Sequence, residues 1–287
     1  MSQTALSFHS EGLRGHQRPA SSPAGTKSTG RAMPRVRIIV AVLAVCALLL
    51  AAAVALAAET LTVTAAFSPD KLGAPTNVHG AAIIHSTDEL VPTPIIKTTV
   101  MGPAGLAVDV KGVGICDPAK LEAELEPKAC PNDSKAGFGG GTGVLELAKE
   151  VIKEPFTLNF FRGPNEDGHL VLLAYLNAIS PVSVQLVLKA QVVKEPKPYG
   201  LGFTFIVPLI PTLPGASDAS AEEIFITLGA PNAAYFETVH GKRKLVHVKG
   251  IIVPKKCPSG GFPYKTEISF ADGTTNTVKG AIPCPHG

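Results

Sequence analysis

The chain has 287 residues, of which 45% are hydrophobic and 17% charged, and its formal net charge is +3. That charge is unevenly divided: residues 1–58 carry six basic residues and one acid, a net of +5, so residues 59–287 carry −2. Nucleic-acid binding depends on a basic face, and the larger part of the chain lacks the charge for one. Its roughly 230 residues are enough for one sizeable core or two small ones.

An uncharged apolar run occupies residues 38–58 (IIVAVLAVCALLLAAAVALAA), and three arginines precede it, namely Arg31, Arg35 and Arg37. A basic flank, an apolar core and an exit of small residues are typical of a secretory signal peptide. The small-x-small triplet at residues 55–57 predicts cleavage after Ala57 or Ala58.

An uncleaved membrane anchor is the alternative, because about 20 apolar residues can span a bilayer. The arginines favour an N-terminus that stays inside. The run is rich in alanine rather than leucine, which makes it a weak permanent span. In both cases residues 59–287 lie outside the cytoplasm, so we expect a secreted or cell-envelope-associated protein.

The segment before the apolar run, residues 1–32, is rich in Ser, Gly and Pro, which predicts disorder. A chain that began at Met33 would have a signal peptide of ordinary length, so we expect either that start or a dispensable cytoplasmic tail. Cys46 suggests a lipoprotein, but Val45 stands where a lipoprotein site needs a small residue.

The first segment after the leader, residues 60–67 (TLTVTAAF), has its apolar residues at every second position, with threonines mostly between them. Such alternation predicts a half-buried strand. Residues 76–85 and 94–101 are predicted to be the next two strands, and the prolines between them favour an edge position.

One short helix is predicted at about 118–126. Asp117 can cap its first turn and Pro118 suits the first helical position. Leu121 and Leu125 fall on one face, and Pro127 ends the pattern.

Strands are then predicted at residues 142–153, 156–161, 170–176, 182–193 and 201–207. The sequence RGPNEDG at residues 162–168 is a turn signal. Residues 182–193 give the clearest pattern, because Val, Leu and Ala alternate with Ser, Gln and Lys, as in an antiparallel sheet with one solvated face.

Prolines at every third position (Pro208, Pro211 and Pro214) predict an extended crossing or a linker, with a subdomain break near 208–221 as one option. Five further strands are predicted at residues 223–228, 233–240, 244–253, 264–270 and 274–282. Asp272-Gly273 indicates a hairpin between the last two. This C-terminal part is small for a core of its own, so we expect it to join the same sandwich; a second subdomain is the alternative.

About a dozen short strands with regular turn signals predict an all-β fold, an antiparallel β-sandwich of jelly-roll-like or Ig-like type. The expected organisation is a disordered extension at 1–32, a signal peptide or anchor at 33–58, and a β-sandwich domain at 59–287.

Four cysteines follow the leader: Cys116, Cys130, Cys257 and Cys284. An even number in an exported chain predicts disulfides. Of the three possible pairings we favour Cys116–Cys130 and Cys257–Cys284, because partners near in sequence close small loops. Zinc sites need closely spaced ligand pairs, and these spacings are too wide.

Candidates for metal binding or catalysis are weak. His79 and His85 could share a strand face and meet the other histidines of the domain, His169, His240 and His247, but tight His-x-His spacing is missing. We therefore expect surface histidines and no metal or cofactor.

The glycine-rich stretch GFGGGTG at residues 137–143 lacks the strand-before, helix-after context of a phosphate-binding loop. We expect it to be a flexible entry to a strand. No Gly-x-Ser-x-Gly elbow is present, and Ser134 is expected to satisfy turn backbone. Glu122, Glu124 and Glu126 belong to the predicted helix surface, so we expect no catalytic carboxylate pair and no enzyme.

The local basic cluster contains Lys242, Arg243 and Lys244, with Lys249, Lys255 and Lys256 nearby. It could meet an anionic envelope polymer or a lipid surface. A solvated hairpin tip is the plainer interpretation.

Several pieces of the sequence resemble a group of uncharacterised secreted β-rich proteins of actinobacterial type. They are the Ala/Val-rich leader, LTVTAAFSPDKLGAPT, CPNDSKAGFGGG and the closing CPSGGFPYKTEISFADGTTNTVKGAIPCP. The resemblance implies an exported β-rich protein but no reaction, and it carries over no catalytic residue.

The leader, the alternating strands and the lack of a catalytic pattern favour an exported, non-enzymatic β-sandwich that acts as an envelope-associated structural or interaction module. A small-ligand or polysaccharide-binding domain is the second hypothesis. A filled sandwich interior would favour the first, and a large apolar or acid-lined pocket would favour the second.

Overall fold

The computed structural model describes residues 59–285, apart from residues 88, 90, 148–149, 181, 213–216 and 230–233. The predicted extension, signal peptide or anchor, cleavage site and alternative start all lie outside the described residues. The described residues belong to one compact unit.

Fifteen strands, one α-helix and two 3₁₀ helices make up the described chain. In chain order they are β1 (Glu59–Ser68), β2 (Pro75–Ser86), β3 (Ile95–Pro103), β4 (Ala107–Asp109), α2 (Pro118–Glu124), η1 (Pro127–Ala129), η2 (Asn132–Ser134), β5 (Lys135–Leu147), β6 (Glu150–Arg162), β7 (Leu170–Ala178), β8 (Val184–Lys194), β9 (Tyr199–Ile206), β10 (Ser220–Leu228), β11 (Ala234–Val239), β12 (Lys242–His247), β13 (Gly250–Ile252), β14 (Phe262–Phe270) and β15 (Thr275–Ile282).

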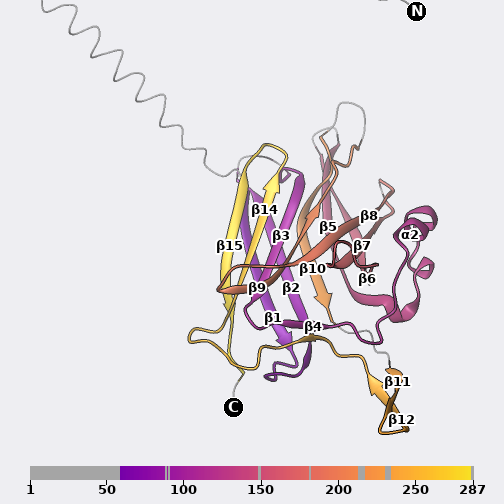
Figure 1. Cartoon of the computed structure of the whole chain (residues 1–287). Coiled ribbons are helices and arrows are strands. Elements are labelled where there is room, and N and C mark those ends of the chain that lie inside the picture. The colour runs from indigo at the N-terminus through magenta and orange to yellow at the C-terminus, as the bar shows by residue number, and fades with distance from the viewer. Residues whose placement is uncertain are drawn as a thin grey trace, which may run out of the picture. The chain divides into compact units, whose positions relative to one another are not determined.

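Thirteen of the strands form one antiparallel sheet in the order β15-β14-β3-β9-β8-β7-β6-β5-β10-β2-β13-β4, with β1 paired to β2. The sheet folds back on itself, so that β5 to β8 form one layer and β1, β2, β3, β14 and β15 the other (Figure 1). Strands β11 and β12 make a separate two-stranded sheet.

The β15 edge of the sheet meets β1 without pairing to it in a ladder. The Asn276 side chain on β15 donates to the Glu59 carbonyl on β1 at 2.6 Å, and the Tyr264 hydroxyl on β14 donates to the Val63 carbonyl at 3.0 Å. Side chains thus replace backbone pairing at this seam.

The predicted all-β, antiparallel and disulfide-stapled fold is confirmed, and both layers of the sandwich belong to one ladder. The alternation expected for β1 is present: the side chains of Thr62 and Thr64 are exposed, while Phe67 is buried. Period-two alternation places the apolar half of each such strand toward the other layer.

Strand β7 departs from this alternation because both of its faces are covered. Leu172 and Ala174 belong to the core between the layers, whereas Val171, Leu173 and Tyr175 pack in a second core on the outside. A strand that is buried on both faces reads as a continuous apolar run, which explains the sequence LVLLAYLNA.

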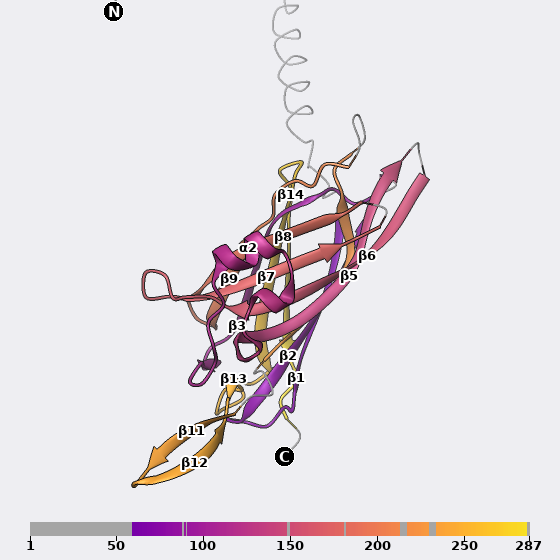
Figure 2. The ribbon, with the colours of Figure 1, turned by 90° about the vertical axis from the view of Figure 1, so that its right-hand side faces the viewer.

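Helix α2 supplies the outer cover of β7 and β8 (Figure 2). Asp117 caps it by accepting from the Ala119 amide at 3.0 Å, and Pro118 lies in its first turn. The Cys116–Cys130 disulfide and the fully buried Leu121 hold the helix against the sheet. The predicted cap, helix and disulfide are confirmed.

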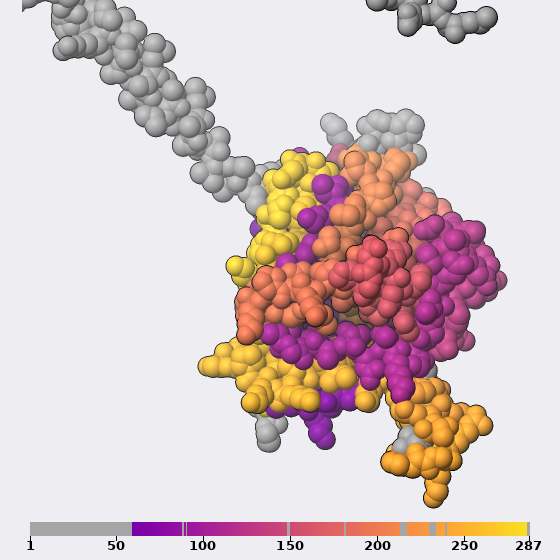
Figure 3. Space-filling model, in the orientation of Figure 1, coloured from indigo at the N-terminus to yellow at the C-terminus, as the bar shows by residue number. Residues whose placement is uncertain are grey.

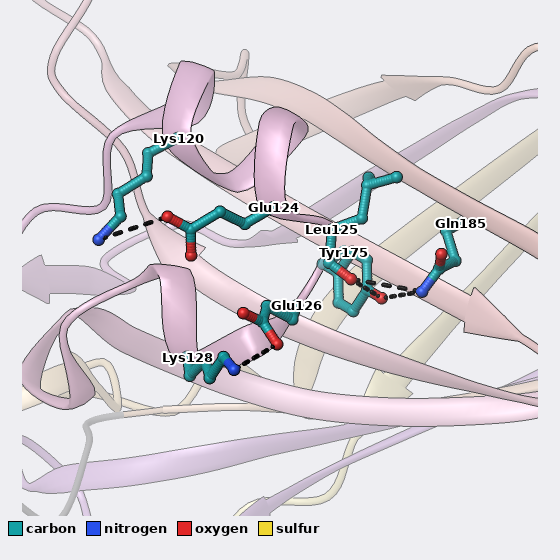
Figure 4. A network of polar contacts seen from close by, with 7 residues as sticks. All are labelled: Lys120, Glu124, Leu125, Glu126, Lys128, Tyr175 and Gln185. Atoms are coloured by element: carbon teal, nitrogen blue, oxygen red, sulfur yellow. Dashed lines mark hydrogen bonds and ion pairs between the residues drawn. The ribbon is translucent and has the colours of Figure 1, made fainter.

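Polar contacts fix the C-terminal end of this helix to the sheet (Figure 4). Leu125 ends α2 in a left-handed conformation, and its carbonyl accepts from the Tyr175 hydroxyl and, at 3.3 Å, from the Gln185 amide. Because the last carbonyls of a helix have no internal partner, these strand side chains complete the helix end.

The second disulfide, Cys257–Cys284, closes the opposite part of the domain. It joins the segment before β14 to the segment after β15, beside a core formed by Phe67, Val253, Phe262 and Ile282. The predicted pairing is therefore confirmed for both disulfides.

Two predictions about the middle of the chain are wrong. The strand predicted at 142–153 contains a reversal, since β5 ends at Leu147 and β6 begins at Glu150. No Gly, Pro or Asn marks this turn, so the local composition carries no signal for it.

The glycines at 137–143 lie inside β5 and are not a flexible entry to it. A β-carbon on Gly141 would lie 1.9 Å from the Glu223 carbonyl oxygen of β10, and one on Gly139 would lie 2.4 Å from that of Phe225. Glycine in a strand commonly marks such a close backbone approach, and here it occurs where the ladder passes from β10 to β5.

Candidate functional site

The space between the layers contains an apolar cavity of about 280 Å³. Every strand of the long sheet except β4 and β13 contributes to its wall, with residues such as Val63, Val100, Phe156, Leu176, Phe203 and Ile224. An apolar cavity of about 150 Å³ stays dry and binds benzene in an engineered protein. This larger cavity is thus suited to an apolar guest.

Small side chains on the inward faces leave this space unfilled. Ala65 of β1, Ala82 of β2 and Ala174 of β7 all line the cavity, as does Gly143. Native interiors otherwise pack to the density of organic crystals, with few voids larger than a water molecule. The cavity is therefore unusual for a core that serves stability alone.

A second apolar cavity of about 160 Å³ adjoins the first. The two share the wall residues Val78, Val100, Gly102, Leu106, Phe203 and Ile226. The second extends toward β13 and toward the segment after β4, where Val110 and Val113 contribute. The two cavities are therefore neighbours, separated by the side chains that line both of them.

The inward row of β6 carries a charged residue at each end. It runs Glu154, Phe156, Leu158, Phe160, Arg162; Glu154 lines the first cavity and Arg162 the second. Eight residue steps of extended strand, at about 3.3 Å each, place the backbones of these two residues about 26 Å apart along the strand.

Among the described residues, the buried side-chain atoms without a hydrogen-bond partner are Glu59 Oε2, Glu154 Oε1 and Arg162 Nε. Unsatisfied buried polar atoms are rare in native structures because each costs about 1–3 kcal/mol. Two of these three atoms belong to cavity-lining residues, so a buried polar group without a partner lies in the wall at each end of the space.

At the first end, Glu154 is only 4% exposed, and its Oε2 accepts from the Val182 amide at 3.3 Å. Ser220, which also lines the cavity, donates to the Thr93 carbonyl at 3.1 Å, and the Thr93 amide donates to Glu59 Oε1 at 2.7 Å. This end therefore contains a buried carboxyl group and a hydroxyl.

At the second end, the Arg162 Nη1 group donates to the carbonyls of Val113 at 2.8 Å and Val110 at 3.3 Å. The guanidinium thus ties β6 to the 110–113 segment. Because its Nε–H has no partner among the described residues, this end contains a buried, positively charged donor.

The β11–β12 hairpin projects from the body (Figure 3). One of its faces rests on the body: Tyr235 packs directly over Gly112, and Lys111 forms an ion pair with Glu237. The hydrogen bond from Lys111 to the Glu237 carboxylate, together with their opposite charges, raises the pKa of Lys111 above its usual value.

The predicted basic cluster lies on this hairpin and beyond it. Lys242, Arg243 and Lys244 are exposed, and the Arg243 guanidinium lies 3.9 Å from the centre of the Phe236 ring. Lys249 pairs with Asp109 at 3.6 Å. The structure therefore brings one member of the cluster, Arg243, next to an exposed aromatic side chain, which the sequence did not indicate.

The other candidate residues are dispersed. His79 and His85 lie on β2, His169 in the β6–β7 turn, and His240 and His247 on the hairpin; the described residues contain no group of three or more potential metal ligands. Ser134 donates to the Pro131 carbonyl at 2.6 Å, as predicted for a turn residue. Glu124 and Glu126 pair with Lys120 and Lys128 at the surface (Figure 4).

The cavity and its charged ends were not predicted from the sequence. The segment EPFTLNFFR contains a signal for them, because Glu154 and Arg162 are in phase with the apolar side chains between them. That signal was missed because the predicted strand began at residue 156 and left Glu154 in a gap between two strands.

No family model, curated protein or solved structure matches this chain. Within the described part of the chain, no helix is long and apolar enough to cross a membrane. Two disulfides are typical of an oxidising, extracytoplasmic environment.

Proposed function

We propose that this domain is an exported binding protein for a single-chain amphiphile. The apolar cavity between the layers is the observation that carries this proposal. It favours the second of the two functions considered above, ligand binding, over a purely structural module.

The volumes suit one acyl-like chain. If about 150 Å³ holds the six carbons of benzene, the first cavity holds about eleven carbons and the second about six. A chain of about 16 to 18 carbons would then fill both cavities, and a lipid with two such chains would not fit.

The ends of the space indicate the polar chemistry of the ligand. If these buried side chains turn toward the cavity, a ligand hydroxyl or amide can donate to Glu154 Oε1, and an anionic group can accept from Arg162 Nε. Hydrogen bonds that involve a charged partner are roughly twice as strong as neutral ones. No step of this proposal requires catalysis, a metal or a cofactor, and the site supplies binding and shielding from water.

Adjacent alanines of β1 allow a direct test. Ala65 lines the cavity, whereas the Ala66 side chain is exposed on the other face of the same strand. We expect Ala65→Phe to fill the cavity and to lower the affinity for a fluorescent C16 fatty acid at least tenfold, while Ala66→Phe binds as the unchanged protein does.

The measurement is a fluorescence titration of residues 59–287, with thermal unfolding as a check that both variants fold. Native mass spectrometry of protein recovered from its exported location should also show a retained apolar molecule. Equal binding by the two variants, or no binding by the unchanged protein, would reject the proposal.

A further inference from the structure

We propose that the β11–β12 hairpin docks the domain on an anionic lipid surface. This inference goes beyond ligand binding in the cavity and does not depend on it, because it rests on the outward face of the hairpin and on its charge.

The body determines which face of the hairpin points outward. Tyr235 and Glu237 are on the face that contacts Gly112 and Lys111, so Phe236 must lie on the opposite face. Strand side chains alternate between faces. The orientation of the outward face is therefore set by contacts and not by the flexibility of an isolated hairpin.

The outward face carries an apolar pair. Phe236 of β11 lies directly across from Leu245 of β12, and the two residues are 57% and 51% exposed. Exposure of an apolar pair to water is unfavourable, and exposed apolar side chains on a protruding element suit insertion into the membrane–water interface.

The charge on the hairpin is opposite to that of the domain that carries it. Residues 234–247 contain three basic residues, Lys242, Arg243 and Lys244, and one acid, Glu237, a net of +2, whereas residues 59–287 as a whole carry −2. An anionic surface would attract the hairpin and leave the rest of the domain in solution.

The combination of charge and apolar contact favours lipid over a soluble anionic polymer. A polymer would engage the basic side chains and leave Phe236 and Leu245 in water. Arg243 shares the face of Phe236 and Leu245, whereas Lys242 and Lys244 alternate onto the other face. A bilayer interface takes both kinds of contact, because the long side chains of lysine and arginine reach the headgroups while the apolar pair enters the acyl boundary.

The hairpin also adjoins segments that line the second cavity. Gly112, on which Tyr235 rests, lies between the cavity-lining Val110 and Val113, and β13, which follows the hairpin, supplies Gly250 and Ile251 to the same wall. On a docked molecule, the Arg162 end of the apolar space would therefore be the end near the membrane.

The lack of tryptophan makes a clean spectroscopic test possible. Phe236→Trp would place a single reporter on the hairpin, and Phe225→Trp would place one on β10, where Phe225 is 47% exposed. With vesicles of phosphatidylcholine and phosphatidylglycerol, the tryptophan emission of the first variant should shift to the blue, and that of the second should not.

Co-sedimentation of residues 59–287 with the same vesicles tests the charge. Each basic residue near an anionic surface contributes about 1 kcal/mol, so replacing Lys242, Arg243 and Lys244 by glutamine should weaken binding about a hundredfold. The matched control replaces Lys97, Lys194 and Lys279, three exposed lysines on the body, and should bind as the unchanged domain does.

Two further arms separate the alternatives. Phe236→Ser with Leu245→Ser should lower vesicle binding at least tenfold, and vesicles of phosphatidylcholine alone should not bind. Equal binding to neutral and anionic vesicles would overturn the lipid proposal. So would equal binding to dextran sulfate and to vesicles, if the Phe236 and Leu245 changes affect neither. Fatty-acid binding in the cavity is unaffected by any of these outcomes and is scored separately.

Discussion

Gly141 of β5 allows β10 to approach closely where the sheet passes from one layer to the other. Its missing side chain leaves room for the Glu223 carbonyl, which a β-carbon would approach to 1.9 Å. A side chain there forces the backbone of β5 and β10 apart at the point where the ladder changes layer.

We therefore expect Gly141→Ala to destabilise the domain by about 1–3 kcal/mol, the usual cost of overpacking. Gly143→Ala on the same strand is the matched control, because its β-carbon would meet its nearest atoms at 3.4 and 3.5 Å, an ordinary contact distance. Urea unfolding of both variants measures the difference. Equal midpoints would show that the strands can separate without cost.

An ion pair on β14 should make the stability of the domain depend on pH. Lys265 lies 2.7 Å from Glu267 on β14, and its hydrogen bond lowers the pKa of that carboxyl below the usual value of about 4.5. A lowered folded-state pKa adds stability above the unfolded pKa, and this stability is lost as the pH falls through the folded-state pKa.

The Lys265→Met variant should therefore lose about 0.5–1 kcal/mol at pH 7 and nothing near pH 2. Lys279→Met is the control, since Lys279 faces Lys265 across the β14–β15 pair and makes no hydrogen bond to Glu267. Urea midpoints at several pH values give the comparison. A deficit that persists unchanged at pH 2 would contradict the assigned ion pair.

At the scale of elements, the sequence predicted what depends on local pattern. The cap of α2, the alternation of β1 and the hairpin at Asp272-Gly273 are all set by neighbouring residues, and all are present. The β5–β6 reversal was missed because nothing in its composition marks a turn. The glycines of β5 were misinterpreted because their role depends on β10, a strand distant in the sequence, which no local pattern reveals.

Helix α2, with its disulfide, should be able to unfold locally while the rest of the domain stays folded. It covers Val171, Leu173 and Tyr175 on the outer face of β7, and the Cys116–Cys130 bond closes the short loop that contains it. Loop-entropy estimates give about 3 kcal/mol for a loop of about 15 residues.

Replacing Cys116 and Cys130 by serine should therefore cost about 3 kcal/mol and should raise amide hydrogen exchange in α2 and β7. Replacing Cys257 and Cys284 instead should cost a similar amount but raise exchange at the ends of β14 and β15. Hydrogen exchange followed by mass spectrometry distinguishes the two. The same exchange pattern in both variants would show that the disulfides do not brace separate parts of the fold.

At the scale of the whole molecule, the cavity is the feature that the sequence could not predict. Alternation indicates which side chains point inward, but whether they fill the interior depends on the spacing of strands from all parts of the chain. The inward alanines, such as Ala65 and Ala174, are consistent with an underfilled interior only once the layers are known. The placement of Glu154 and Arg162 at the ends of the apolar space depends in addition on where β6 begins and ends.

The size of the cavities gives the last prediction, which concerns ligand length. Each methylene that is buried contributes about 0.8 kcal/mol, so affinity for saturated fatty acids should rise up to about fourfold per carbon. The rise should stop at about 16 to 18 carbons, when both cavities are full by the benzene comparison. Displacement of a fluorescent probe from residues 59–287 by acids of about 8 to 22 carbons measures the curve, and Ala65→Phe should move its plateau to shorter chains while Ala66→Phe leaves it in place. An affinity that is independent of chain length would mean that the apolar interior is not where the ligand binds.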